Sequence, residues 1–489
     1  MKPAHISTRT NVLHAATRKE RSLDQMLASQ ALSRVTGASA VPGNSLTLLK
    51  NGAENYPAWL EAIQSAESSV QFENYIIYND ATGRTFVDLL AERARAGVRI
   101  HFLYDWLGCF RKTSRQMLRT MAQAGVQIRC FNPPGYDSPL GWLSRNHRKT
   151  LMVDGRVGFV SGLCIGDAWM GDPTGKRKPW RDTGVMIEGP VLNDLEAAFR
   201  HSWNAAGPAL ERLEAPIPRH TRPTTGDVSI RLIEGQPSEM GVYRLDLLIA
   251  AGVQDRLWLT DAYFVGTTAY IQALGEAARD GVDVRLLVPG ISDIPITQAL
   301  SRASYRPLLE AGVRIFEWNG PMLHAKTAVA DGHWARVGST NLNIASWIGN
   351  WELDVAIEDS TFAEAMESMY LEDLAQSTEV VLDVKHRPQS VSVTPRSPGA
   401  QRLKKKSTAR MAAGSLGIGN TVGAALTNRR AVGRAEAGVL AGAGAILLTL
   451  AILAAFFPRL IAVPITLLAL LVGGGLLVRA WKLRHPGGV

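Results

Sequence analysis

The chain has 489 residues, 46% of them hydrophobic and 20% charged, which is enough apolar sequence to bury a large core. Its formal net charge is +9, yet residues 385–434 hold eleven Lys or Arg and no Asp or Glu, so the remainder carries a net −2. This distribution disfavours a generally basic, nucleic-acid-binding fold. The odd number of cysteines and the lack of C-x-x-C spacing argue against disulfides and zinc at Cys109, Cys130 and Cys164.

The N-terminal stretch, residues 1–44, is polar, rich in Ser and Thr, and contains scattered Arg and Lys. It has no apolar run of the length that a secretory signal needs. We therefore expect a poorly ordered basic tail and no export of the region that follows.

From residue 45 onwards, one structural unit occurs twice. Each copy begins with a short apolar strand and then alternates helices with strands until it reaches a histidine motif. Gly97 and Gly281 stand at corresponding helix ends. The paired strands, first copy before second, are expected at residues 45–49 and 229–233, 70–78 and 256–265, 98–105 and 282–289, and 126–131 and 313–318.

This alternation predicts an α/β fold made of two similar lobes, with mixed or parallel sheets flanked by helices. The first lobe is expected at residues 45–213 and the second at 228–384, joined by a Pro-rich linker at 214–227. Residues 385–436 form a second linker, rich in Pro, Ser, Gly and basic residues, which serves either as a spacer or as a contact to anionic lipid.

Two uncharged apolar runs, residues 438–457 and 460–478, follow the basic linker. Each is about 20 residues long, the length of a helix that crosses a bilayer. Basic residues flank both outer ends, so the positive-inside rule places both flanks in the cytoplasm. The sequence predicts a transmembrane helical hairpin at 437–479 in the inner membrane, with the catalytic lobes on the cytoplasmic side. A buried helix pair in a soluble domain is the alternative.

Each copy of the repeat contains the pattern H-x-K-x4-D. On a strand, side chains alternate, so the His and Lys of one motif share a face. One imidazole can attack phosphorus while a lysine neutralises the phosphate oxygens, and a second imidazole can protonate the leaving alkoxide. The duplication thus predicts two half-sites around one phosphate. The candidate catalytic residues are His147, Lys149, Asp154, His324, Lys326 and Asp331.

We expect neither a metal nor another cofactor at these histidines. The lysine that follows each of them would repel a divalent ion in the first coordination shell. Metal dependence and surface histidines without a function remain as alternatives.

These motifs resemble the signature of the phospholipase D superfamily, H-x-K-x4-D-x6-G-S-x-N. The second copy matches it completely, with Gly338, Ser339 and Asn341 at the required spacing. The segments NHRKTLMVDGRVGFVSG, WRDTGVMIEGP and NWELDVAI are similar to those of bacterial cardiolipin synthases. The resemblance covers roughly residues 45–375.

The resemblance implies that a downstream carboxylate orients each histidine. The matching positions are Asp182, 35 residues after His147, and Glu352, 28 residues after His324. Such a carboxylate fixes the imidazole tautomer and stabilises the imidazolium.

The resemblance also implies that Ser339 and Asn341 bind the phosphate. The first copy departs from the pattern, because Cys164 stands where an Asn is expected and a thiol is a weak donor. Although Asp154 and Asp331 are among the catalytic candidates, we expect them to support the site structurally, since the histidines fill both proton-handling roles.

The family resemblance implies a phosphatidyltransferase that joins two phosphatidylglycerol molecules into cardiolipin plus glycerol through a phosphohistidine. By family analogy His147 is the nucleophile, although symmetry alone does not decide between the two histidines. A hydrolytic phospholipase D is the first alternative, and a phosphodiesterase or nuclease the second. The expected partners are phospholipids, with phosphatidylethanolamine as a further candidate substrate, and the membrane, but not nucleic acid.

Overall fold

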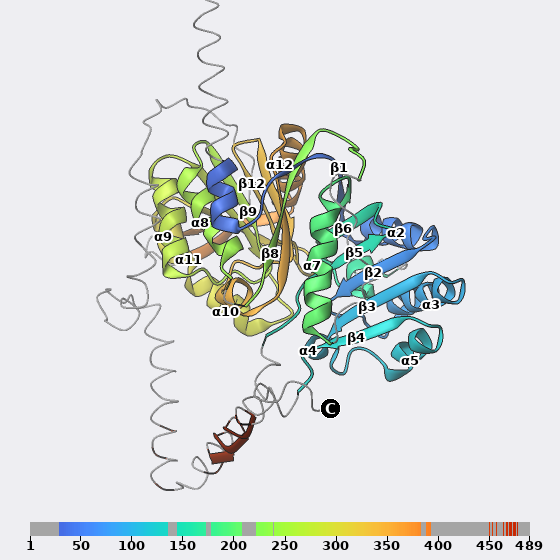
Figure 1. The fold of residues 1–489 in the computed structure, drawn as a ribbon. Coiled ribbons are helices and arrows are strands. Elements are labelled where there is room, and N and C mark those ends of the chain that lie inside the picture. The colour runs from blue at the N-terminus through green and yellow to red at the C-terminus, as the bar shows by residue number, and fades with distance from the viewer. Residues whose placement is uncertain are drawn as a thin grey trace, which may run out of the picture.

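The computed structural model describes the lobes and little of the termini. It covers residues 29–134, 144–172, 178–207, 222–237 and 239–382, the backbone of 388–392, and scattered helical residues between 449 and 477. Two lobes lie side by side, each with helices on the outer face of its strands (Figure 1).

The first lobe contains seven of the named strands and six of the named helices. Its strands are β1 (Val41–Lys50), β2 (Ser69–Asn74), β3 (Arg99–Asp105), β4 (Gln127–Phe131), β5 (Thr150–Val153), β6 (Val157–Ser161) and β7 (Thr183–Glu188). Its helices are α2 (Asn51–Gln64), α3 (Ala81–Arg95), α4 (Trp106–Cys109), α5 (Arg115–Gln123), α6 (Asp167–Met170) and α7 (Leu192–Ala205).

The second lobe repeats this order. Its strands are β8 (Val228–Gly235), β9 (Arg256–Thr260), β10 (Asp283–Pro289), β11 (Arg314–Trp318), β12 (Thr327–Ala330), β13 (Trp334–Gly338), β14 (Glu352–Ile357), β15 (Ser377–Leu382) and β16 (Pro388–Ser392). Its helices are α8 (Gly241–Gly252), α9 (Thr268–Arg279), α10 (Pro295–Ala303), α11 (Tyr305–Glu310), the π-helix η4 (Ala345–Gly349) and α12 (Ser360–Leu374).

All these strands belong to one sheet of 16, in the order β16-β15-β11-β10-β9-β12-β13-β14-β8-β1-β7-β6-β5-β2-β3-β4. Only β2-β3-β4 and β9-β10-β11 pair in parallel, and the other pairings are antiparallel. The predicted two-lobed α/β fold is confirmed, with a mixed sheet. The sheet is not mainly parallel because each motif strand turns back in a tight hairpin, β5-β6 or β12-β13, which can pair only in antiparallel fashion.

The two lobes share a core. Helices α7 and α12 lie between the lobes, whereas α2, α3 and α5 cover one outer face and α8, α9 and α11 the other (Figure 1). Leu195 of α7 and Met366 of α12 belong to one buried cluster with Val185 of the first lobe and Val355 of the second. Because such packing is dense, the lobes behave as one body around their boundary.

Order begins earlier than the predicted boundary at residue 45. Residues 29–36 are helical and β1 starts at Val41. Leu32 packs into the core of the second lobe, and Arg231 donates to Ser33 Oγ at 2.7 Å. These tertiary contacts stabilise a segment whose polar composition alone suggested disorder.

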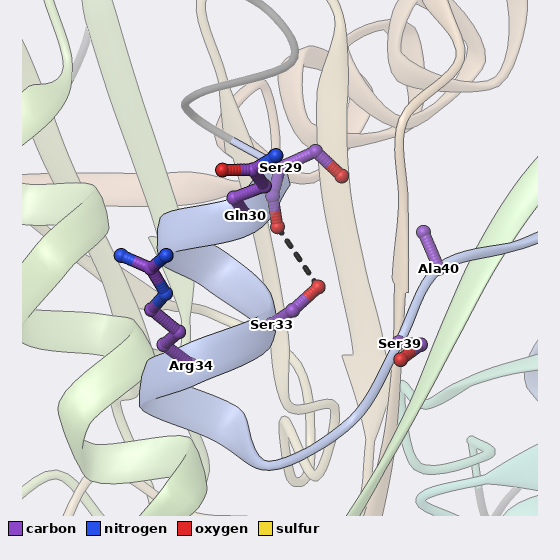
Figure 2. A pocket seen from close by; sticks show the side chains of 6 residues that line it. All are labelled: Ser29, Gln30, Ser33, Arg34, Ser39 and Ala40. Atoms are coloured by element: carbon purple, nitrogen blue, oxygen red, sulfur yellow. Dashed lines mark hydrogen bonds between the residues drawn. The ribbon is translucent and has the colours of Figure 1, made fainter.

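A shallow hollow lies beside this first helical segment (Figure 2). No residue of either histidine motif lines it, so it is separate from the candidate site. Its lining residues are Ser29, Gln30, Ser33, Arg34, Ser39 and Ala40.

Three predicted segments lie largely outside the described residues: the linker at 214–227, the basic linker at 385–436 and the apolar hairpin at 437–479. Among the residues that are described, no helix has the length and apolarity to span a bilayer.

Candidate active site

Backbone hydrogen bonds bring both histidine motifs to the boundary between the lobes. The N–H of His147, just before β5, donates to Trp351 O at 2.8 Å. The N–H of His324, just before β12, donates to Arg181 O at 2.7 Å. Each acceptor comes from the opposite lobe and directly precedes one of the carboxylate residues predicted from the sequence.

The histidines and carboxylates are paired across the lobes, and the predicted pairing within each copy is wrong. His147 Nδ1 lies 2.9 Å from Glu352 Oε2, and His324 Nδ1 lies 2.8 Å from Asp182 Oδ2. The physical reason is the backbone bridging just described, because it aligns each histidine with the strand that carries the other lobe's acid.

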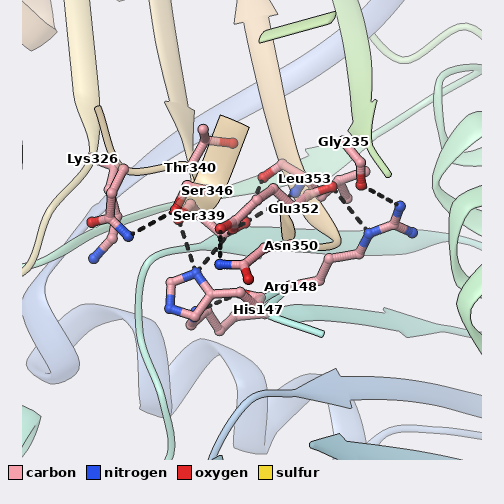
Figure 3. Close-up of polar contacts among 12 residues, drawn as sticks. His147, Arg148, Gly235, Lys326, Ser339, Thr340, Ser346, Asn350, Glu352 and Leu353 are labelled. Carbon is pink, nitrogen blue, oxygen red and sulfur yellow. Dashed lines mark hydrogen bonds and ion pairs between the residues drawn. The ribbon is translucent and has the colours of Figure 1, made fainter. Parts of the chain in front are cut away.

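Several donors fix the carboxylate of Glu352 (Figure 3). Ser339 Oγ donates to Oε2 at 2.6 Å, and Asn350 Nδ2 donates to Oε1 at 3.1 Å. Arg148, fully buried, donates through Nε to the backbone oxygen of Glu352 at 3.0 Å. The hydroxyl of Ser339, predicted to bind phosphate, is therefore engaged with the acid that holds His147.

The acid of the other pair is held differently. Trp169 Nε1 donates to Asp182 Oδ2 at 2.8 Å, and the N–H of Thr183 donates to Oδ1 at 2.9 Å. Gly162 occupies the position that corresponds to Ser339, and a Cβ there would come within 2.2 Å of Asp182 Oδ1. Only glycine leaves room for this carboxylate.

Both motif lysines are buried at the site. Lys149 Nζ donates to the backbone oxygen of its own motif histidine, as does Lys326 Nζ. Lys326 Nζ also lies 3.1 Å from His324 Nδ1. Burial lowers the pKa of Lys149 to about 8 and lowers the pKa of Lys326 as well. The two ammonium groups place positive charge where it can neutralise the oxygens of a phosphate group.

Burial also keeps the histidines neutral at rest. It lowers the pKa of His147, and burial together with Lys326 lowers the pKa of His324 to about 4. For Asp182 and Glu352, burial acts to raise the pKa, but the paired histidine, the nearby motif lysine and further hydrogen bonds together outweigh it, and the pKa of each is lowered. A neutral imidazole beside an ionised carboxylate is a competent nucleophile or base.

The motif aspartates lie at the far ends of the motif strands, in the hairpin turns. Asp154 has φ 52° and Asp331 has φ 49°, and each precedes a glycine that is also left-handed. Asp154 accepts backbone hydrogen bonds from residues 67–69, and Asp331 accepts them from residues 254–256. Each carboxylate therefore ties its hairpin to the start of the neighbouring strand.

The two half-sites differ at the position of the motif asparagine. Asn341 Nδ2 lies 3.4 Å from Ser346 Oγ, while its Oδ1 is buried with no partner among the described residues. Cys164, in the corresponding place, is buried, and burial raises the pKa of its thiol. Asn341 therefore keeps polar capacity for a ligand, whereas Cys164 offers an uncharged thiol.

Aromatic rings that had no assigned role surround the histidines. The ring of Tyr75 lies 4.9 Å from that of His147, and the ring of Tyr263 lies 5.9 Å from that of His324. Their matching places in the repeat were visible in the sequence. By contrast, no feature of the sequence predicted that Trp169 contacts Asp182.

No group of three or more His, Cys, Asp or Glu side chains within the described part of the chain is arranged to hold a metal ion. The residues that converge on the site are instead imidazoles, ammonium groups and carboxylates.

The fold and the paired motifs define a protein of the phospholipase D class. Among solved structures, a phosphatidylserine synthase of Haemophilus influenzae Rd KW20 aligns with 73% of this chain and 92% of its own, with a TM-score of 0.56 and 12% identity. A polyphosphate kinase of Porphyromonas gingivalis aligns with 78% and 53%, with a TM-score of 0.50 and 13% identity. At these identities the likeness concerns the fold.

Sequence relatives are more specific. A family model described as cardiolipin synthase, PLD-like domain, matches residues 59–170 and 247–374. Cardiolipin synthase A of Pseudomonas fluorescens (strain SBW25) is 34% identical over 72% of this chain and 73% of its own. A probable cardiolipin synthase of Bacillus subtilis (strain 168) is 32% identical over 68% and 67%. The chain belongs to the cardiolipin synthase family.

Proposed function

We propose that the protein is a phosphatidyltransferase that joins two phosphatidylglycerol molecules into cardiolipin and glycerol. The observation that supports this most is the pair of buried imidazoles, each beside an ionised carboxylate of the opposite lobe and each with the buried lysine of its own motif close by. This arrangement suits a phosphodiester that must be attacked from one side and protonated on the other.

In the first half-reaction, His147 Nε2 attacks phosphorus and forms a P–N bond while the P–O bond to the head-group glycerol breaks. His324 Nε2 gives its proton to that oxygen, and glycerol leaves. The phosphate charge, once bound, raises the pKa of both histidines and so supplies the protonated form that the free protein lacks. Lys149 and Lys326 neutralise the oxygens that carry the developing charge.

In the second half-reaction, a hydroxyl of another phosphatidylglycerol enters. His324 Nε2 takes its proton, the oxygen attacks phosphorus, and the P–N bond to His147 breaks. Glu352 stabilises the imidazolium that His147 carries during the intermediate, and Asp182 does the same for His324.

Limited access of water favours transfer over hydrolysis. The side chains of the site are almost closed to solvent, since only 8% of His147 and 5% of His324 is exposed. A lipid alcohol brought to the phosphohistidine therefore competes well with water.

A membrane anchor belongs to the same proposal. The uncharged runs at 438–457 and 460–478, with basic residues at both outer ends, support a hairpin in the inner membrane with the lobes on the cytoplasmic side. Cysteine labelling from either side of inverted vesicles tests it. Access to the residue 400 region from the periplasmic side would contradict this orientation.

The decisive measurement is incubation of the full chain with phosphatidylglycerol in detergent and a chelator, followed by lipid analysis. Cardiolipin and glycerol in equal amounts are expected. Phosphatidic acid alone would indicate hydrolysis, and no turnover of any phospholipid would overturn both.

The paired motifs predict that His147→Ala and His324→Ala each reduce the rate by at least about 10³-fold. His201→Ala is the matched control, because this histidine is exposed on α7 and, among the described residues, its ion pair is with the partly exposed Glu234. A near-normal rate in either motif variant contradicts the two-histidine mechanism.

A further inference from the structure

Large apolar side chains are exposed mainly around the active site. Among the residues described between 29 and 382, ten such side chains are exposed, and eight of them lie in four short segments. A soluble surface usually scatters these residues singly. We call the four segments the apolar rim: residues 107–110, 170, 291–300 and 344.

In the first lobe, the rim is attached to His147. Leu107 and Phe110 are exposed on either side of Cys109, whose Sγ lies 3.7 Å from the backbone oxygen of Tyr75. The ring of Tyr75 in turn packs edge-on against His147. Leu107 and Phe110 thus flank a residue that contacts the backbone of Tyr75, whose ring packs against His147.

In the second lobe, the rim is attached to His324. Ile291 and Ile294 are exposed on either side of Asp293, which accepts a hydrogen bond from Tyr263 Oη at 2.8 Å. The ring of Tyr263 packs edge-on against His324. The arrangement repeats that of the first lobe.

The two remaining rim residues are also next to residues that contact the active site. Met170 is exposed next to Trp169, whose ring lies 5.4 Å from that of His324. Ile344 is exposed next to Asn343, whose Nδ2 donates to Tyr263 O at 2.9 Å. Each rim segment therefore contains or adjoins a residue that contacts Tyr75, Tyr263 or His324.

Helix α10 is amphipathic with its apolar stripe facing outward. Ile296, Ala299, Leu300 and Ala303 follow the i, i+3, i+4, i+7 spacing of one helical face, and all four are exposed. The only buried residue of the helix is Ser301. A helix of a soluble protein normally shows the reverse arrangement.

Polar contacts, and not the apolar stripe, hold α10 in place. Arg302 makes two hydrogen bonds of 2.8 Å with Glu317 of β11, and Gln298 Nε2 donates to Gly290 O. Within the described residues, the apolar stripe therefore does not hold the helix in place. Substituting residues of the stripe should leave these polar contacts intact.

Basic side chains border the rim in the first lobe. Arg111, Lys112 and Arg115 are exposed directly after Phe110. Lys112 Nζ lies 5.4 Å from the ring of Tyr78. Such cations beside exposed apolar groups are complementary to an anionic lipid surface. Figure 1 shows α4 and α10 at the same end of the two lobes.

We propose that the apolar rim, with the outward stripe of α10 at its centre, inserts into the surface of an anionic phospholipid bilayer and so places the active-site entrance on the membrane. This inference rests on the proposed lipid substrate. Because the rim borders the entrance, a second copy of the chain seated there would block the site, whereas a bilayer delivers the substrate. The contact is separate from any anchor at 437–479.

The first test places a probe in the rim of the full chain. In a Cys130→Ser background, Ile296→Cys carries an environment-sensitive fluorophore, and Leu371→Cys is the matched control. Leu371 is 48% exposed on α12 and lies outside the rim. The protein is reconstituted in nanodiscs that contain phosphatidylglycerol, with or without doxyl groups on the acyl chains.

The expected result is a blue-shifted emission that doxyl lipid quenches at residue 296 but not at residue 371. Equal, weak quenching at both positions overturns the proposal. A shift at residue 296 that grows with protein-to-lipid ratio also overturns it and indicates contact between copies. A shift present in detergent and insensitive to doxyl lipid overturns it and indicates that a segment of the same chain covers the rim.

The second test separates docking from chemistry. The double variant Ile296→Glu, Leu300→Glu is expected to make cardiolipin at least about tenfold more slowly from bilayer phosphatidylglycerol, because two inserted apolar groups become charged. With short-chain phosphatidylglycerol dissolved as monomers, its rate should stay within about twofold of the parent. Equal rates on bilayers contradict the proposal. If the parent makes no cardiolipin while residue 296 is quenched, the proposed reaction fails and docking stands.

Discussion

Glu352 and Asp182 make each histidine dependent on a residue of the other lobe. Both carboxylates are buried and accept further hydrogen bonds, so neither can turn away from its imidazole without leaving a charge unpaired. Each acid can therefore be removed separately to ask which histidine it serves.

A leaving group that needs no proton makes this distinction measurable. With phosphatidyl-p-nitrophenol, Asp182→Asn is expected to release about one equivalent of nitrophenolate in a burst and then stall, because His324 is impaired only as the base of the second step. The corresponding variant at the other acid is Glu352→Gln, because the shorter Asn side chain would not reach His147. Glu352→Gln is expected to slow the burst by about 10²-fold or more.

Stopped-flow absorbance and isolation of the phosphatidyl-enzyme supply the two readouts. The reverse pattern, a burst in Glu352→Gln and none in Asp182→Asn, would show that the acids serve the histidines of their own lobes or that His324 is the nucleophile. Labelling of His147 separates those two cases.

The lowered pKa of Lys149, about 8, predicts how anion binding responds to pH. Below that pKa the lysine is charged and contacts phosphate, and as the pH rises through 8 it loses its proton and the contact. The Kd of a short-chain phosphonate analogue should therefore rise by about 10-fold or more between pH 7 and 9.5, which is a loss of affinity. Isothermal titration calorimetry measures this Kd. The control is Lys149→Ala, which should bind the analogue weakly and with less dependence on pH. A constant Kd across the range contradicts the prediction.

The sequence identified the polar residues of the site but not their pairing. A repeat constrains residues within one copy, whereas His147 and Glu352 are 205 positions apart and His324 and Asp182 are 142 apart. Contacts at such separations depend on how the lobes pack, which periodicity does not specify. For the same reason Ser339 was assigned to phosphate and not to Glu352.

At the scale of elements, the hairpins β5-β6 and β12-β13 present the motif residues at one end and are tied down at the other. Asp154 accepts three backbone and one hydroxyl hydrogen bond of 2.8 Å. Burial acts to raise its pKa, but the backbone donors outweigh this and lower it to about 2. The stabilisation by the ionised side chain is complete above pH 4 and is lost as the pH falls toward 2.

Asp154→Ala is therefore expected to reduce the free energy of unfolding by about 2–4 kcal/mol while the folded fraction retains its activity. Urea titration and an assay at low temperature test the two parts. Asp88→Ala, an exposed position on α3, is the control. Normal stability with abolished activity would instead indicate a catalytic aspartate.

Elements with strong internal patterns could be predicted from the sequence, and those that depend on tertiary contacts could not. The buried strands β3 and β10 match the apolar runs expected at 98–105 and 282–289. The helical segment at 29–36 has a polar sequence and is held by Leu32 and Arg231 contacts. The outward stripe of α10 would have been placed in the core by its helical period alone.

At the scale of the whole molecule, the lobes are held together by more than their linker. Strand β1 pairs with β8, one buried cluster includes residues of both lobes, and Arg148 of the first lobe donates to backbone oxygens of β14 and β8. We therefore expect residues 1–213 and 214–489, co-expressed as two chains, to copurify through a single tag and to retain lipid transfer. Lipid transfer by either chain alone, at concentrations where it is monomeric, would contradict this prediction.

Each histidine is paired with a carboxylate from the opposite half of the chain. A chain of half this length would therefore lack a complete histidine–carboxylate pair. Such a chain could assemble one only by meeting a copy of itself, and its activity would vary with its own concentration. Covalent fusion removes that dependence, and it also releases the two copies from having to be identical. Gly162 opposite Asp182 and Ser339 beside Glu352 show that the two halves support the same chemistry with different residues.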